Sequence, residues 1–174
     1  MIALKITDIK NFMGRLLLKD DFDLFLTEKA EVLTSYEMSL SGRRNLEWYD
    51  SDVSEKLVQE MPEAVVWMTW GELKNNVFEF IKGKQSPVYL RLSFRVSGKM
   101  AEEFMKDSGI LQLYLEQMPE LHFQVRYERK ELVIVSGISF PQFTLDKSLE
   151  RAWDEMLSVL LKKKGISCEE YEES

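Results

Sequence analysis

The stretch that decides the fold is VYLRLSFRV, residues 88–96. Its apolar side chains stand at every second position: Val88, Leu90, Leu92, Phe94 and Val96. The residues between them are Tyr89, Arg91, Ser93 and Arg95. Because successive side chains of a strand point to opposite faces, this stretch predicts a strand with one dry face and one polar face in contact with water.

Other segments repeat this alternation. Residues 121–140 predict a hairpin that turns near Arg129 and Lys130. Residues 30–40 carry apolar side chains at even positions and predict one half-buried strand, bent near its middle. Shorter strands are expected at residues 1–6, 22–26 and 64–68.

Amphipathic helices lie between these strands. One begins with a capping box at Thr69 and Glu72 and stops at Gly83. Asp146 is expected to cap the last helix. Further helices are expected at residues 9–17, 53–61 and 98–107, and residues 110–118 fit a helix slightly better than a strand.

These elements together indicate the fold class. A purely parallel sheet would show strands that are apolar throughout, whereas these strands alternate. We therefore expect an α+β fold, with a mainly antiparallel sheet, helices packed on one of its faces and a C-terminal amphipathic helix.

Composition narrows the class of protein. The chain has 174 residues, a net charge of −7, one cysteine and one histidine. We expect a single globular domain at residues 1–168 and a flexible acidic tail at 169–174. No apolar run reaches the length of a membrane span, and the N-terminus lacks the pattern of a signal peptide, so we expect a cytoplasmic protein without a membrane partner.

Few residues suggest catalysis. GKQS at 83–86 ends a helix and leads into a strand, the reverse of a phosphate-binding loop. Cys168 is flanked by glutamates, which disfavour a thiolate. The acidic group Asp20, Asp21 and Asp23 suits either a Mg²⁺ site or a charged turn. We expect no catalytic residue, metal site or cofactor. The lack of paired histidines, of a reactive cysteine and of a phosphate-binding loop favours a protein that is not an enzyme.

The best candidate for a binding site is the polar face of two strands. If residues 88–96 and 121–127 are neighbours in the sheet, arginines and an aromatic ring share its outer face. Such a face could hold a carboxylate or a phosphate, or it could be neutralised by Glu31, Glu37 and Glu128. The candidate residues are Tyr89, Arg91, Arg95, His122 and Arg126, with Gln124 beside them.

Three longer stretches carry a resemblance to a family. They are ALKITDIKNFMGRLLLKDDFDLFL (3–26), FIKGKQSPVYLRLSF (80–94) and FTLDKSLERAWDEM (143–156). The chain resembles an uncharacterised, clostridial-type bacterial family of unknown function over nearly its whole length. This resemblance implies a single-domain intracellular bacterial protein and brings no activity or site residue. The chain departs from the family's pattern at YERKEL (127–132), where a tighter Asn-Gly turn would be expected.

A second resemblance concerns the order of elements. A helix followed by antiparallel strands occurs twice, which is similar to half of a sliding clamp. The inner helices of clamps present basic residues to DNA, whereas the helix at 98–107 offers Glu102 and Glu103 as well as lysines.

Three functions follow from these observations. The leading one is a non-catalytic binding or interaction domain that meets a protein partner or another copy of itself. The alternatives are a nucleic-acid-associated accessory protein of clamp-like build and a carboxylate-dependent, metal-assisted enzyme.

Overall fold

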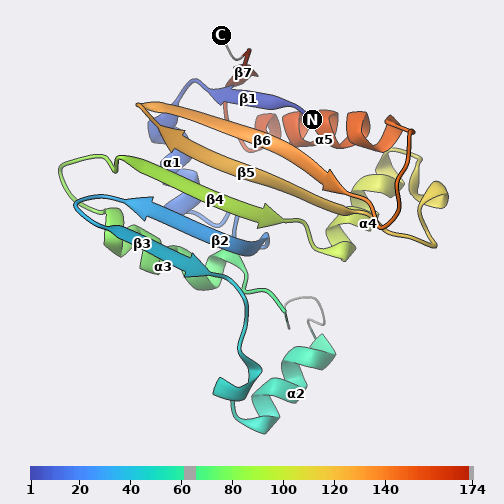
Figure 1. Ribbon diagram of the computed structural model, residues 1–174, viewed down its shortest axis with the longest axis horizontal. Coiled ribbons are helices and arrows are strands. Elements are labelled where there is room, and N and C mark those ends of the chain that lie inside the picture. Colours follow the sequence, from blue (N-terminus) through green and yellow to red (C-terminus); the bar gives the residue numbers. More distant parts are fainter. Residues whose placement is uncertain (61–65, 173–174) are drawn as a thin grey trace.

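The computed structural model describes residues 1–60 and 66–172 (Figure 1). The strands are β1 (Ala3–Ile6), β2 (Leu26–Leu33), β3 (Glu37–Ser41), β4 (Tyr89–Arg95), β5 (Glu120–Glu128), β6 (Glu131–Ser139) and β7 (Cys168–Glu170). The α-helices are α1 (Ile9–Leu17), α2 (Ser51–Glu60), α3 (Trp70–Ile81), α4 (Gly98–Asp107) and α5 (Ser148–Lys163). Short 3-10 turns occur at Leu46–Trp48 and Leu111–Leu113.

The seven strands form one antiparallel sheet in the order β3-β2-β4-β5-β6-β1-β7. Helices α1, α3, α4 and α5 lie behind the sheet in Figure 1, and its front face carries no helix. The structure therefore confirms an α+β fold with helices on one face of an antiparallel sheet.

The core lies between the sheet and this helix layer. Leu90, Leu92 and Phe94 of β4 are almost fully buried, as are Phe123 and Val125 of β5. The alternation in the sequence correctly predicts the dry and wet faces of β4 and β5, although Val88, expected on the dry face, lies outside β4 and is 57% exposed. Burial of these side chains drives formation of the sheet, because each removes apolar area from water.

Two tryptophans connect the helices to the sheet. Trp70 of α3 is buried, packs edge-on against Phe94 and donates its indole N–H to the carbonyl of Leu16, 2.7 Å away. Trp153 of α5 donates to the carbonyl of His122, 3.1 Å away. These bonds satisfy the polar atom of each large buried ring, one on the backbone of α1 and the other on the backbone of β5.

The α2 helix stands apart from this body. Residues 43–60 form an arm that leaves the end of β3 and carries α2 away from the sheet (Figure 1). None of the residues of α2 is buried. The base of the arm is nevertheless fixed, because Arg44 forms a bidentate ion pair with Glu72 and a hydrogen bond to the hydroxyl of Tyr49.

Two predicted strands differ from the structure. Residues 30–40 are not one bent strand: β2 ends at Leu33 and β3 starts at Glu37, with a turn between them. The expected strand at 22–26 is a turn up to Phe25, and β2 begins only at Leu26.

Smaller differences lie in the connections. The expected helix at 110–118 is a 3-10 turn followed by irregular chain. Asp146 does not occupy the cap of α5, which is Lys147, although its carboxylate accepts a hydrogen bond from the N–H of Ser148. The helix end expected at residue 61 and the first part of the strand at 64–68 lie outside the described residues, and Trp67 makes only an isolated bridge to Arg43.

The acidic C-terminal segment is partly ordered. Cys168, Glu169 and Glu170 form β7 and pair with β1, with Glu169 opposite Lys5. The sequence assigns this segment to a flexible tail, whereas the structure makes its first residues an edge strand. A lysine opposite a glutamate is a favourable cross-strand pair, which helps to explain why an acidic strand adds to the sheet here.

Candidate functional site

The open face of the sheet brings the predicted site residues onto one surface. Arg91 of β4 lies directly opposite Arg126 of β5, and Arg95 lies directly opposite His122. Tyr89 stands two positions from Arg91 on the same strand, so its side chain lies on the same face. The surface divides into two parts, which differ in how far their charges are neutralised.

The first part is the arginine pair, Arg91 and Arg126. The guanidinium of Arg91 lies over the ring of Tyr89, 4.2 Å from its centroid, and 3.5 Å from a carboxylate oxygen of Glu128. Both side chains of this ion pair are about half exposed, so water weakens their attraction. These contacts therefore fix the position of the Arg91 side chain but neutralise only part of its positive charge.

Arg126 has a neutral neighbour. Its guanidinium donates to the amide oxygen of Gln124 at 2.6 and 3.1 Å. Among the residues that the structure describes, no carboxylate lies within 4.0 Å of it. Like charges directly opposite each other on neighbouring strands destabilise a sheet. The pair therefore keeps positive charge that an added anion would neutralise.

The surroundings of the arginine pair are mixed. Val133 and Val135 of β6 lie beside Arg126 and Gln124 and are half-buried. Glu31 of β2 lies directly opposite Arg91. Burial first, and then a hydrogen bond to Glu37, raise the pKa of Tyr89 above its usual value, so its hydroxyl stays protonated at neutral pH. The result is a small cationic centre with an apolar flank and an acidic rim.

The second part of the surface is neutralised. Arg95 forms ion pairs with Glu28 at 2.6 Å and with Glu120 at 2.9 Å, and it lies over the ring of Trp67. The three glutamates named from the sequence as partners, Glu31, Glu37 and Glu128, do not include these two. Arg95 is therefore a poor site for an external anion, although it lies beside a pocket of about 330 Å³ lined by Trp67 and Val96.

The imidazole of His122 packs closely against Gly137. A Cβ added to Gly137, its neighbour on β6, would stand only 2.2 Å from Cε1 of the imidazole. Burial lowers the pKa of His122 below its ordinary value, and the nearby Arg95 lowers it further, while Glu28 and Glu120 act in the opposite direction. The ring is therefore neutral at pH 7, and its Nε2 lies 3.3 Å from the hydroxyl of Ser139.

Three residues of this surface were not among the site residues predicted from the sequence. Glu28 reaches the face because the register between β2 and β4 shifts between Thr27 and Lys29. Trp67 joins it through the isolated bridge to Arg43. Gly137 is signalled in the sequence as the one glycine within a predicted strand, which often marks close contact with another group.

Two of the three carboxylates at 20–23 pair with basic side chains. Asp21 lies 3.5 Å from Arg15, and Asp23 accepts a 2.7 Å bond from Lys74. Within residues 1–60 and 66–172, no three His, Cys, Asp or Glu side chains gather so as to hold a metal ion. Burial raises the pKa of Cys168, which disfavours its thiolate. No helix in the same residues has the length and apolar character needed to span a membrane.

Comparison with known families agrees with the resemblance noted in the sequence. Residues 15–169 match a family of unknown function, DUF5721. The chain belongs to this family. No curated protein and no solved structure matches the chain. The open sheet face described above lies entirely within the DUF5721 match.

Proposed function

We propose that this DUF5721 protein is a non-catalytic binding domain of the bacterial cytoplasm. In this proposal the arginine pair, Arg91 and Arg126, binds a carboxylate of an acidic segment on a partner protein. The observation that carries it is the placement of Arg91 and Arg126 opposite each other on neighbouring strands of an open face, where among the described residues only a neutral amide is bonded to the guanidinium of Arg126.

The chemistry of the face favours a short acidic peptide. A guanidinium can donate two hydrogen bonds to a carboxylate. That of Arg126 bonds only Gln124 among the described residues, whereas that of Arg91 leans the other way, toward Tyr89 and Glu128. Val133 and Val135 offer an apolar flank for a neighbouring side chain of the ligand. The site lies on paired strands, so its backbone is already ordered before a ligand binds.

Nucleic acid fits the same face less well. The protein carries a net charge of −7, and the arginine pair has the acidic rim formed by Glu31 and Glu128. A long phosphate backbone would meet this rim, whereas one carboxylate can avoid it. The clamp-like accessory role is therefore the alternative outcome of the test, and the metal-assisted enzyme has no grouped ligands to support it among the described residues.

The test compares two fluorescent probes by polarisation at low and at physiological salt. One is a glutamate-rich decapeptide and the other a single-stranded DNA decamer. The variants are Arg126→Ser and the double change Arg91→Ser with Arg126→Ser. Arg151→Ser, on the exposed side of α5, is the matched control for loss of an arginine.

We expect the wild type and the control to bind the peptide more tightly than the DNA. A hydrogen-bonded charge contributes about 1.5–3 kcal/mol, so Arg126→Ser should weaken peptide binding by at least about tenfold. If the peptide binds equally well to the double variant, or if DNA binds more tightly than the peptide in an arginine-dependent way, the proposal is wrong.

A further inference from the structure

The outer edge of β3 is open to pairing with another strand. It is the last strand of the sheet on its side, within the part of the chain that the structure describes. The N–H of Gly42 donates to Glu28 of β2, so by strand alternation the N–H and C=O groups of Glu37, Ser39 and Ser41 point outward. The strand has no proline, lysine or bulge, three of the features by which natural edge strands avoid association, although it is short and carries the charge of Glu37.

The sequence of β3 is complementary to itself. In an antiparallel pair of two β3 strands centred on Ser39, Glu37 of one copy faces Ser41 of the other, and Ser39 faces Ser39. All the outward backbone groups are then paired. Met38 faces Leu40 on the helix side of the sheet, and no two like charges face each other. A two-fold axis at Ser39 satisfies these conditions.

The arm extends beyond the β3 edge, on the side where a second copy would pair. It leaves the C-terminal end of β3 and extends past the edge of the sheet (Figure 1). Trp48 on the arm is 84% exposed, and Val53 and Val58 of α2 are about half exposed. Such apolar side chains on a projecting helix indicate a surface that packs against another molecule.

Charge indicates which surface of the second copy the arm would meet. The arm, residues 43–60, holds five carboxylates against Arg43, Arg44 and Lys56, a net charge of −2, and its part beyond Arg44 has a net charge of −4. Antiparallel pairing brings the C-terminal end of one β3 beside the N-terminal end of the other. At that end Tyr36 is exposed and packs edge-on against Phe80.

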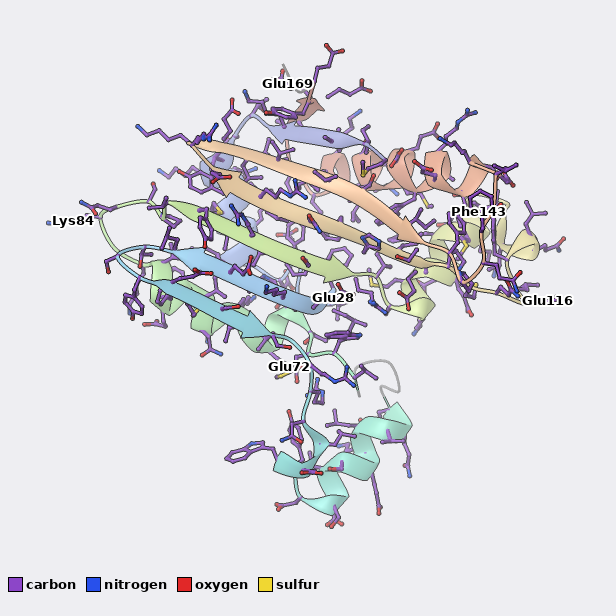
Figure 2. All side chains as sticks on the ribbon, in the orientation of Figure 1. Glu28, Glu72, Lys84, Glu116, Phe143 and Glu169 are labelled. Carbon is purple, nitrogen blue, oxygen red and sulfur yellow. The ribbon has the colours of Figure 1, made fainter. Side chains whose placement is uncertain are left out.

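The same end of the sheet carries two lysines, of which Lys82 pairs with Glu79 at 2.5 Å. Lys82 and Lys84 follow α3 and are exposed, and Figure 2 places Lys84 at the end of the sheet opposite the arm. The adjoining chain is tied to β2, because the N–H of Val88 donates to the carbonyl of Leu33. The basic chain and the exposed ring of Tyr36 therefore lie together.

We propose that two copies of the chain associate through their β3 edges, with a two-fold axis at Ser39. Each arm lies against the surface formed by Tyr36, Lys82 and Lys84 of the other copy. A pair of five-residue strands alone buries far less than the roughly 1,600 Å² of a standard interface. The arms supply the additional area. This dimer uses the edge of the sheet and leaves the arginine pair on its open face free.

The test measures mass by sedimentation velocity and light scattering across a concentration series. Wild type should show twice the chain mass of 20.5 kDa at micromolar concentration. Ser39→Pro removes an outward N–H, which the folded monomer does not use, and edge strands tolerate such a proline. Ser39→Lys instead sets two lysines opposite each other. Each change should raise the dimer Kd by at least about tenfold, and Ser39→Thr should retain the dimer.

The arm is tested separately. Trp48→Ala should raise the dimer Kd by at least about tenfold, since buried tryptophans often dominate interface energy. Phe143→Ala, at a ring that is 90% exposed elsewhere on the molecule, is the control and should have no effect. Far-ultraviolet circular dichroism confirms that each variant folds.

Three results would overturn the proposal. One is a wild type that remains monomeric at about 100 μM. Such a protein would have a dimer Kd weaker than that of specific complexes of this size. Another is a dimer that survives both Ser39→Pro and Ser39→Lys, since a dimer paired at Ser39 could not. The third is a dimer unaffected by Trp48→Ala, which would remove the arm from the interface. Arg126→Ser should leave the dimer unchanged, so this result and the peptide-binding test fail independently.

Discussion

Replacement of Gly137 by alanine tests the geometry of the open face most directly. The new Cβ would stand 2.2 Å from Cε1 of His122, 2.6 Å from Nδ1 and 3.1 Å from Nε2. Ordinary carbon contacts lie at about 3.5–4.0 Å. The imidazole must therefore move by roughly 1.3–1.8 Å, and the open face leaves it room to turn toward water.

This movement has a defined effect on the pKa. Burial is the largest cause that lowers the pKa of His122 below 6.5, so a ring displaced into water should recover much of that shift. The free energy of unfolding need change little. A displaced rotamer costs about 0.5–1.5 kcal/mol, whereas alanine in place of glycine in a strand gains roughly 0.5–1 kcal/mol. The pKa is therefore the informative measurement.

The assay uses the fact that His122 is the single histidine of the chain. Its imidazole protons give one titrating set of NMR signals. In the wild type the midpoint should lie below 6.5, and in Gly137→Ala it should rise toward 6.5. Gly14→Ala, in α1 with nothing within 4 Å of the added Cβ, is the control and should leave the midpoint unchanged.

Stability should follow the same group. Where the folded pKa is lowered, the unfolded state binds more protons between that value and about 6.5. The free energy of unfolding therefore falls as pH drops below about 6.5, and His122 has no effect on it above that pH. This fall should be smaller in Gly137→Ala. An unchanged midpoint in the variant would refute the placement of the ring over Gly137.

Three further substitutions test the fold and the base of the arm by thermal or urea unfolding. Gly42→Ala should cost about 3 kcal/mol or more, because its Cβ would lie 1.6 Å from the carbonyl oxygen of Thr27, and a variant as stable as wild type would contradict that packing. Arg44→Ala should lower the free energy of unfolding by about 2–3 kcal/mol, because the Arg44 side chain is 1% exposed and pairs with Glu72. A loss under about 0.5 kcal/mol would mean that the ion pair is exposed to water. Gly14→Ala should stabilise by about 0.5–1 kcal/mol, as expected for an unobstructed helix position, and a loss of stability would show a hidden contact.

The two hairpins show which parts of the fold the sequence could reveal. In the β5–β6 hairpin the buried positions change from odd to even across the turn at Arg129 and Lys130, so the break in phase marks the turn. In the β2–β3 hairpin residues of the same parity face each other, as Ala30 faces Leu40. The alternation therefore runs through that turn without a break, and the sequence predicts one long strand.

The candidate site was predictable to the same extent. Alternation placed Arg91 and Arg126 on a wet face, but the alignment that sets them opposite each other depends on strand order and register. The neutralisation of Arg95 depends on an irregularity at Glu28, which no period-two pattern contains. Distant contacts of this kind arise from tertiary packing, and local sequence does not encode them separately.

The distribution of interactions over the two faces supports a binding role for the open one. The helix side holds the buried aromatic core and the hydrogen bonds of Trp70 and Trp153, which account for the cohesion of the fold. The arginine pair contributes nothing comparable, because two like charges oppose each other there and the ion pair of Arg91 is half exposed. Beyond the contact of Arg91 with the ring of Tyr89, the open face therefore adds little to the cohesion of the fold, and the anionic ligand that we propose would relieve the repulsion between its two arginines.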